Sequence, residues 1–471
     1  MDESSPLATP GWPRKSRKKA LTRYTRSVVA INTSTRLQDV PEIDNQIKEL
    51  TEGKEEPGWV TEKRYQGMRG FKSAPSTDPI ISDPLEFIAR RDETPADEIE
   101  SLDDLPRDTK KLLDELGISE MEQRALQGLT IQDDTGMIDS SFRQKWEERG
   151  VIMAPMEEAL REYPEARERF MQLYDPEESK LAAYHTAIWN GGVFLWVKEG
   201  VKEEIPLHLF FLIQQEALAQ APHIVIFAEP HSEIKLIEGC TSPILSRHSL
   251  HLDMTELYVG EGASVDLTVL QNWPEYVHTR PTQRGKIARD GELSITSVGL
   301  GPGKSNITDP KYWVEEGGRV EINNILLTKE DSHVDLGGEI YLEGEESTGI
   351  NNSKAVIMDE SRVITRGTIN ARNSRTKGHI SCDALVMENG AAMETYPGLS
   401  SEVDDAELSH EAAIGKIKEE ELFYLMSRGL DEDEATRLIV QGFIEPAIED
   451  LPDEYLSEIR KIIELSVEGE M

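Results

Sequence analysis

Residues 264–273 read Ser-Val-Asp-Leu-Thr-Val-Leu-Gln-Asn-Trp, a stretch in which apolar and polar side chains alternate. Val265, Leu267 and Val269 share one face of an extended chain, which predicts a β-strand with one buried side. The alternation recurs, with Gly or Asn turns between the segments, in residues 193–197, 207–213, 320–322 and 380–386. A spacing of roughly 10–15 residues without intervening helices predicts a wound or stacked β architecture. A β-sandwich would give much the same pattern, so periodicity leaves both architectures open.

Helical spacing of apolar residues precedes and follows this β region. Asp103-Asp104-Leu105-Pro106 and Ser119-x-x-Glu122 are typical helix starts, and further helix is expected from about Pro155 to Tyr174. After Ile417 three helical stripes are expected: Leu422, Leu425 and Met426; Ala435, Leu438, Ile439 and Phe443; Tyr455, Ile459, Ile462 and Ile463. The predicted organisation is a basic arm (1–55), a helical region with a linker (56–185), a β core (186–408) and a C-terminal helical domain (409–471).

The composition is typical of a soluble protein, with 38% apolar and 30% charged residues. No stretch approaches the roughly 20 apolar residues of a membrane helix. The net charge of −38 repels phosphates and anionic lipids, so we expect neither nucleic acid nor a membrane as a main partner. Two cysteines cannot form a disulfide framework, which predicts a reducing, cytoplasmic setting. The basic residues 1–36 predict a disordered arm, with a transit peptide as the alternative.

Two short strings carry groups suited to iron and sulfur chemistry. Residues 238–243, Glu-Gly-Cys-Thr-Ser-Pro, place Cys240 between two alternating apolar segments. Residues 409–411, Ser-His-Glu, supply an imidazole and a carboxylate at the end of the β region. A thiolate, an imidazole and a carboxylate together can hold iron and sulfur transiently. A buried structural cysteine is the alternative for Cys240, and a satisfied surface or core histidine is the alternative for His410.

Further strings make the chain resemble a known family. They are Glu56-Pro57-Gly58-Trp59, Trp189-Asn190-Gly191-Gly192, Gln271-Asn272-Trp273 and Phe423-Tyr424-Leu425-Met426-Ser427-Arg428-Gly429. With Glu-Gly-Cys and His-Glu, they resemble the SufB/SufD scaffold proteins of iron–sulfur cluster assembly, and the SufB branch is the closer match. The resemblance spans roughly residues 56–465. It implies a mainly β fold: a right-handed parallel β-helix core flanked by N-terminal and C-terminal α-helical domains.

The resemblance also implies a function and partners. A SufB-like chain accepts sulfur from a cysteine-desulfurase relay, builds a transient iron–sulfur cluster at a dimer interface and serves apo iron–sulfur proteins. Its dimer partner is a second copy or a SufD-like paralogue, and its C-terminal helices bind a SufC-type ABC ATPase. Reduced flavin is a further cofactor that the resemblance leaves open. The string 301–305, Gly-Pro-Gly-Lys-Ser, is no P-loop, because Val298 takes the place of the first glycine. We therefore expect an assembly scaffold that is not itself an enzyme, with ATPase activity in the partner.

The resemblance assigns roles to particular residues. Cys240 is the implied sulfur acceptor, and Cys240, His410 and Glu411 are the implied ligands of iron in the cluster. A thiolate that attacks a persulfide predicts a lowered pKa at Cys240. Gln271 and Trp273 are expected to line an inner path near Cys240, with structural packing as an equal alternative. Cys382, in phase with the apolar face of residues 380–386, is expected to lie in the core.

Two departures from the family pattern leave a second reading open. The SufB branch that this chain resembles has a Cys-Gly-Ala-His-Thr motif. At the matching positions this chain has Ala391 in place of the cysteine and Glu394 in place of the histidine. Ser409 stands where the family often has a glutamate. A SufD-like structural partner without its own cluster is therefore the alternative, favoured by Ala391 and opposed by Cys240 and Glu411. A β-helix enzyme such as a polysaccharide lyase would need clustered carboxylates, and no spacing singles out a pair.

Overall fold

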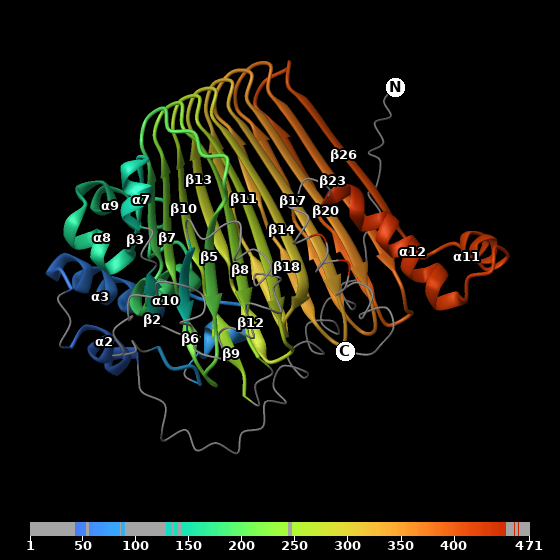
Figure 1. Ribbon diagram of the computed structural model, residues 1–471, viewed down its shortest axis with the longest axis horizontal. Coiled ribbons are helices and arrows are strands. Elements are labelled where there is room, and N and C mark those ends of the chain that lie inside the picture. The colour runs from blue at the N-terminus through green and yellow to red at the C-terminus, as the bar shows by residue number, and fades with distance from the viewer. Residues whose placement is uncertain are drawn as a thin grey trace, which may run out of the picture.

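Three β-sheets, parallel except for the pairs β1–β2 and β3–β4, wind around a common axis in the computed structural model of the chain (Figure 1). The structure describes residues 43–52, 56–84, 86–89, 129–133, 136–139, 143–243 and 247–448, with Leu456 and Arg460. Successive strands pass from one sheet to the next and then return to the first, as β8, β9, β10 and β11 do. The predicted parallel β-helix is therefore confirmed, and the sandwich alternative falls, because a sandwich pairs its strands antiparallel. The helices expected over 103–122 and most of the stripe over 455–463 lie outside the described residues.

From β5 onward, each coil contributes one strand to each sheet. The ten-stranded sheet has the order β2 (Gly136–Asp139), β1 (Leu129–Asp133), β5 (Leu207–Leu212), β8 (Glu233–Thr241), β11 (Ser264–Trp273), β14 (Glu292–Pro302), β17 (Arg319–Thr328), β20 (Thr348–Ile357), β23 (Lys377–Val386) and β26 (Glu407–Gly415). The nine-stranded sheet has the order β25 (Gly398–Ser401), β22 (Thr368–Ala371), β19 (Glu339–Leu342), β16 (Lys311–Val314), β13 (Thr282–Ile287), β10 (Met254–Val259), β7 (His223–Ala228), β4 (Val193–Val197) and β3 (Val151–Pro155). The seven-stranded sheet has the order β24 (Ala392–Thr395), β21 (Arg362–Thr365), β18 (His333–Leu336), β15 (Ser305–Thr308), β12 (Val277–Thr279), β9 (Ser249–His251) and β6 (Ala219–Gln220).

In-register apolar rows hold the coils together. Leu236, Leu267, Ile295 and Ile322 lie side by side on neighbouring strands of the ten-stranded sheet, and all four are buried. Burying each such side chain contributes about 1.5–3 kcal/mol, so a row repeated along the axis fixes the register of every coil. The alternation seen in residues 264–273 is thus the pattern of a strand whose inner face fills the β-helix.

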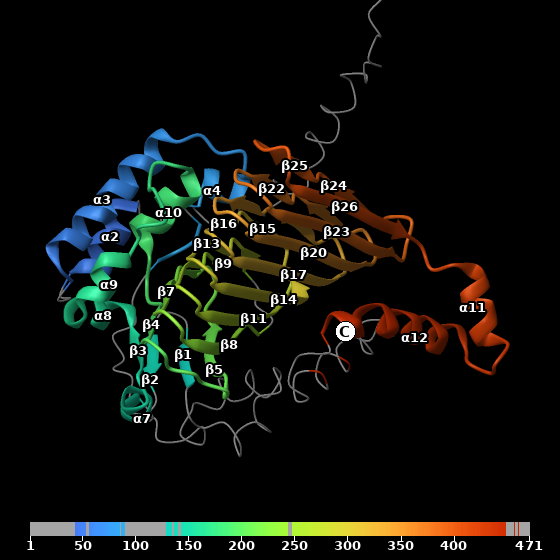
Figure 2. The same ribbon diagram turned by 90° about the horizontal axis from the view of Figure 1, so that it is seen from above.

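N-terminal helices cover the first coils (Figure 2). They are α2 (Ile43–Thr51), α3 (Gly58–Ser73), α4 (Pro79–Ser82), α7 (Arg143–Glu148), α8 (Met156–Glu162), α9 (Pro164–Arg169) and α10 (Lys180–Ile188). The fully buried Arg64 pairs with Glu56 at 2.9 Å and donates to the Trp189 carbonyl at 2.8 Å. At Gly192, where φ is +103°, an added Cβ would lie 2.0 Å from the carbonyl oxygen of His223. Two strings that carried the family resemblance therefore tie this helical region to the β-helix.

Two C-terminal helices follow the last coil. They are α11 (Glu419–Met426) and α12 (Glu432–Ile444), and a 3-10 turn, η3 (Glu445–Ala447), continues α12. Val440 and Ile444 of α12 pack against an apolar patch on the outer face of the ten-stranded sheet, made of Ile237, Leu270, Val298 and Ile325. None of the described helices is long and apolar enough to cross a membrane.

Three segments differ from the expected organisation. Residues 43–51, expected in the basic arm, form α2 and bury Ile47 and Leu50. Strands β1 and β3 lie within the region expected to be helical, because an apolar run as short as Val151–Pro155 has no period to distinguish strand from helix. Strand β26 continues to Gly415, beyond the expected end of the β core at 408. It shows no alternation because nearly all of its residues are exposed.

Candidate functional site

Cys240 lies near the end of β8 with its side chain inside the β-helix. It is fully buried and sits in register between Phe211 of β5 and Gln271 of β11. Glu238, two residues earlier on the same strand, points to the same inner face. The Cys240 Sγ lies 3.6 Å from Glu238 Oε1, so the thiol can donate to this carboxyl group.

His251 reaches the same sulfur from β9 in the seven-stranded sheet, with its Nε2 at 4.0 Å from Sγ. Gln220 fixes the imidazole, because its Nε2 donates to the Leu212 carbonyl at 2.9 Å and its Oε1 faces His251 Nδ1 at 2.9 Å. An amide oxygen only accepts, so Nδ1 carries the hydrogen and Nε2 presents a lone pair to the thiol. The Trp273 ring packs on the imidazole, with ring centroids 4.9 Å apart.

Burial sets the protonation of this group. Desolvation raises the pKa of Glu238 to about 7 and lowers the pKa of His251 to about 3. Burial, followed by the charges of Glu238 and Asp253, raises the pKa of the Cys240 thiol well above its usual value. Burial also raises the pKa of Asp253, and the neighbouring Glu238 adds to this effect. The resting Cys240 is therefore a neutral thiol, the opposite of the lowered pKa expected from sequence.

The interior around Cys240 is polar and incompletely hydrogen-bonded. Gln271 Oε1 accepts from Asn306 Nδ2 at 3.3 Å. Glu238 Oε2, on the carboxyl group that faces the Cys240 thiol, is buried and finds no hydrogen-bond partner among the described residues. Buried polar groups are almost always paired, so this oxygen makes the group a candidate site. Gln271 is the register partner of Cys240, and Trp273 packs on His251. That they line an inner path stays a prediction, with packing as the equal alternative.

The other predicted ligands lie at the far end of the β-helix. His410 and Glu411 belong to β26, the last strand of the ten-stranded sheet, six strand spacings from β8. At ~4.8 Å per spacing, about 29 Å separates the two strands. One chain therefore does not bring Cys240 within bonding distance of an ion held by His410 or Glu411.

His410 and Glu411 also point away from each other. His410 is in register with the buried Ile380 and lies on the inner side of β26, whereas Glu411 is in register with Ser381 and lies on the outer side. Glu411 Oε1 is 3.6 Å from Nε2 of His379, whose Nδ1 is 2.8 Å from the Ser409 hydroxyl. The neighbour of Glu411 is thus His379 on β23.

Comparison with known proteins agrees with this geometry. Residues 211–443 match the family described as SUF system FeS cluster assembly, SufBD core domain. An iron-sulfur cluster assembly SufBD family protein of Pyrococcus horikoshii is 60% identical over 431 residues, covering 91% of this chain and 97% of the relative. The chain belongs to the SufBD family of iron–sulfur cluster assembly proteins. The iron-sulfur cluster assembly protein SufB of Bacillus subtilis is 30% identical over 434 residues, covering 90% of this chain and 92% of that protein.

The second cysteine of this SufBD protein lies in the core, as its phase predicts. Cys382 is 3% exposed, and its sulfur accepts from the Thr395 hydroxyl at 3.2 Å. Ala391 is half-buried near Met393, and Glu394 accepts from the Tyr396 hydroxyl at 2.5 Å. Within the described ranges, no three His, Cys, Asp or Glu side chains are grouped to hold a metal ion.

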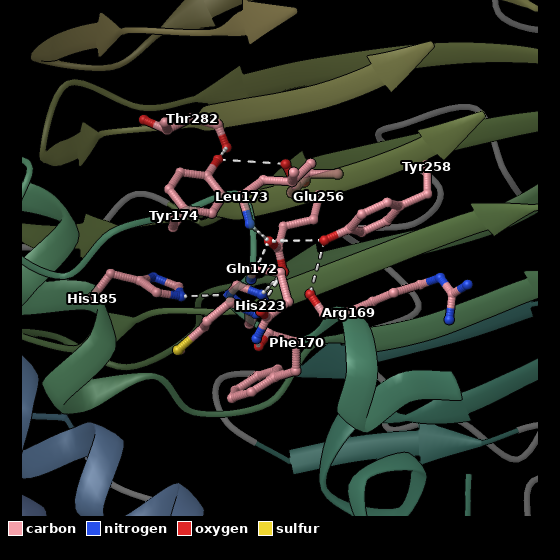
Figure 3. Close-up of polar contacts among 12 residues, drawn as sticks. Arg169, Phe170, Gln172, Leu173, Tyr174, His185, His223, Glu256, Tyr258 and Thr282 are labelled. Atoms are coloured by element: carbon pink, nitrogen blue, oxygen red, sulfur yellow. Dashed lines mark hydrogen bonds and ion pairs between the residues drawn. The ribbon is translucent and has the colours of Figure 1, made fainter. Parts of the chain in front are cut away.

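A second buried polar cluster joins the helical region to the β-helix (Figure 3). Glu256 of β10 accepts backbone N–H groups from residues 171–173 at 2.5–2.8 Å, and His223 Nε2 lies 3.0 Å from its Oε2. His185 of α10 completes the row, with its Nε2 3.1 Å from His223 Nδ1. Burial lowers the pKa of His185 well below its usual value. These contacts tie residues 171–173 and α10 to β7 and β10.

Sequence analysis missed three residues of these sites. The sequence shows His251 only as part of Ser-Leu-His, three residues from His248, a spacing that indicates no metal pair. Its partner is instead Cys240, which comes from a different sheet across the interior. Gln220 and His379 carry no local signal either, because only the register of the coils brings them to their neighbours.

Proposed function

We propose that this SufBD protein is a SufB-like scaffold whose Cys240 receives sulfur as a persulfide. The nascent cluster forms at an interface between two chains, driven by a SufC-type ABC ATPase, in the cytoplasm. The observation that carries the proposal is the placement of Cys240 inside the β-helix beside a carboxyl and an imidazole. A cysteine-desulfurase relay is the sulfur donor, and apo iron–sulfur proteins are the recipients.

Sulfur acceptance needs a base for the Cys240 thiol. As Sγ attacks the outer sulfur of a donor persulfide, a new S–S bond forms, the donor S–S bond breaks and the donor leaves as a thiolate. Glu238 is the nearer acceptor for the thiol proton, and a base with a pKa of about 7 suits neutral pH. His251 stays neutral and orients the sulfur. Glu238 then returns the proton to the departing thiolate, so the exchange needs no external oxidant.

The open end of the β-helix supports the dimer part of the proposal. The strands β24, β25 and β26 form the last coil, and each has a neighbour on one side only among the strands that the structure describes. Such edges favour pairing with another chain. Tyr396, Leu399 and Ile414 are exposed there. In a homodimer His410 and Glu411 would each occur twice at the interface, which partly offsets the thiolate missing at Ala391; a SufD-like paralogue is the other partner.

The C-terminal helices support binding of the ATPase. Phe423 is 74% exposed, and Tyr424, Met426 and Leu438 on the same two helices are also exposed. Val440 and Ile444 pack on the sheet instead, so core packing and partner binding use different residues of this region.

The test is anaerobic co-expression with the matching SufC-type ATPase. Iron, sulfide and visible absorption are measured for the wild type and for Cys240→Ser. We expect a cluster in the wild type that the variant loses while the complex stays intact; a normal yield in the variant would refute sulfur acceptance at Cys240.

Ala391 favours a second candidate, a SufD-like structural partner. That function predicts no cluster in either protein although the complex forms. It also predicts co-purification with a distinct SufB that carries both cysteines.

A further inference from the structure

The last coil of the β-helix is acidic and has no Lys or Arg of its own. Residues 391–415, which carry β24, β25 and β26, contain neither residue type. Their six carboxylates are all exposed: Glu394, Glu402, Asp404, Asp405, Glu407 and Glu411. Exposed apolar side chains, Tyr396, Leu399 and Ile414, lie on the same coil. A surface that combines exposed carboxylates with exposed apolar side chains suits a basic partner segment.

The preceding coil shows how an acidic turn of this β-helix is neutralised. Arg372 Nη1 lies 2.6 Å from Glu343, and Arg375 lies 2.9 Å from both Glu345 and Glu346. In each of these pairs the arginine belongs to the coil that follows the acidic turn. The turn is therefore covered by guanidinium groups that the next coil along the axis supplies.

Among the described residues, no further coil covers the turn between β25 and β26 in this way. Lys377 is in register with Glu407, so Asp404 and Asp405 lie one coil beyond Arg375. Arg375 already pairs with the coil before it, and neither aspartate forms an ion pair with any residue that the structure describes. Two carboxylates therefore stand where the preceding coil receives arginines from its neighbour.

The basic arm of this chain has the matching charge and the necessary reach. Residues 14–36 carry eight Lys or Arg and no Asp or Glu. Helix α2 begins at Ile43, and its apolar side chains share a cluster with Leu250 of β9. In the seven-stranded sheet β9 and β24 are five spacings apart, about 24 Å at ~4.8 Å each. Residues 27–42 can span at most about 50 Å, which is enough for the basic residues before them to reach the last coil.

We propose that residues 14–36 of the basic arm bind the acidic last coil of the same chain, with Asp404 and Asp405 as the central contacts. The arm supplies the positive charge that a following coil would supply, and it covers the edge on which the proposed dimer forms. The arm therefore competes with a partner chain for this edge, and pairing requires its displacement. The contact goes beyond the proposed function, whereas the competition rests on the dimer that the proposed function includes.

Limited trypsin digestion of the full chain measures the contact, because trypsin cleaves after Lys and Arg. Asp404→Asn combined with Asp405→Asn should speed cleavage within residues 14–26 by about tenfold, since two ion pairs are lost. Raising NaCl from about 0.05 M to about 0.5 M should act in the same direction on the wild type, because salt screens exposed charges. Glu315→Gln combined with Glu316→Gln removes two charges from the equivalent turn three coils earlier, and this control should digest as the wild type does.

A carbodiimide, which joins an amine to a carboxylate in contact with it, identifies where the arm lies. We expect Lys15, Lys18 or Lys19 to be joined to Glu402 or Glu407 of the same chain. A mixture of ¹⁵N-labelled and unlabelled protein separates this result from joining between chains. Cross-links between differently labelled chains would assign the arm to a second copy and overturn the contact within one chain. Unchanged cleavage in the aspartate double variant, or cross-links spread over carboxylates on all coils, would overturn the site.

The outcome is independent of the sulfur chemistry. If the arm does not bind but Cys240→Ser loses the cluster, the scaffold function stands without this contact. If the arm binds as expected but Cys240→Ser builds clusters normally, the contact stands and sulfur acceptance at Cys240 falls.

Discussion

Glu256 is the point at which one substitution should separate the N-terminal helical region from the β-helix. Its buried carboxylate accepts the backbone N–H groups of residues 171–173 and faces His223 (Figure 3). Glu256→Gln keeps the shape but turns an N–H₂ group toward backbone donors. Hydrogen bonds to a charged group contribute about 1.5–3 kcal/mol each, and unsatisfied buried donors cost about 1–3 kcal/mol more. Because the side chain is fully buried, solvent does not screen this loss, and we expect about 3–5 kcal/mol.

Hydrogen exchange measures this loss locally, which matters because a chain of this size need not unfold in two states. A loss of about 3 kcal/mol corresponds to roughly a 100-fold faster exchange at residues 171–173 and in α9. Strands β17 to β23 should keep wild-type protection. Glu229→Gln is the matched control, since Glu229 accepts one backbone N–H, from Glu199, at the surface. Unchanged protection at 171–173, or a loss spread evenly over the whole chain, would refute this account of the cluster.

Four further predictions concern the interior and the partner surface. Glu238→Gln should slow persulfide formation at Cys240 by about 10²-fold or more, measured by mass spectrometry after exposure to sodium disulfide, whereas an unchanged rate would exclude Glu238 as the base. Burial raises the pKa of Glu238 from 4.5 to about 7, so the folded chain binds the proton more tightly than the unfolded chain does. The resulting stabilisation, about 3 kcal/mol, is complete below pH 4.5 and lost by about pH 7. Glu238→Gln should remove this pH dependence from the free energy of unfolding measured in urea. Phe423→Glu should weaken binding to the ATPase at least tenfold in a pull-down titration without changing the melting temperature, because the ring is 74% exposed; equal binding would place the interface elsewhere. Asn324→Leu should lower cluster yield and leave persulfide formation at Cys240 intact, because Asn324 lies in the in-register row between Ser297 and Ser353. An unchanged cluster yield would exclude this row as a route for sulfur.

The sequence predicted those strands that bury one face, because their apolar and polar residues alternate. It did not predict strands that are exposed on both faces or that are short apolar runs. Residues 264–273 alternate because their inner face fills the β-helix, so their strand could be found from spacing alone. Strand β26 is exposed on both sides and shows no alternation, so its residues were assigned to the helical domain. Strand β3 is a short apolar run, for which periodicity cannot separate strand from helix.

The candidate site was predictable only to the extent that its residues are close in sequence. Cys240 and Glu238 are two residues apart and carry a recognisable string. His251 and Gln220 meet the thiol from another sheet, across an interior whose coils must first be aligned. The pKa of Cys240 was predicted in the wrong direction, because sequence indicated the chemistry of a thiolate but not the depth at which the thiol is buried.

The interior of the β-helix is not uniformly apolar, and the pattern of its polar residues links the two ends. The in-register row that starts at Glu238 passes, after Val269, through Ser297, Asn324, Ser353 and Cys382. An unbroken aliphatic row, like the one through Leu267, would bury more apolar surface and stabilise the coils further. Polar residues in such a row bury less apolar surface than aliphatic ones, and departures of this kind from an apolar interior are expected at functional sites. Since about 29 Å separates β8 from the open end, a scaffold that takes sulfur at Cys240 needs a route of this kind to reach iron at the interface.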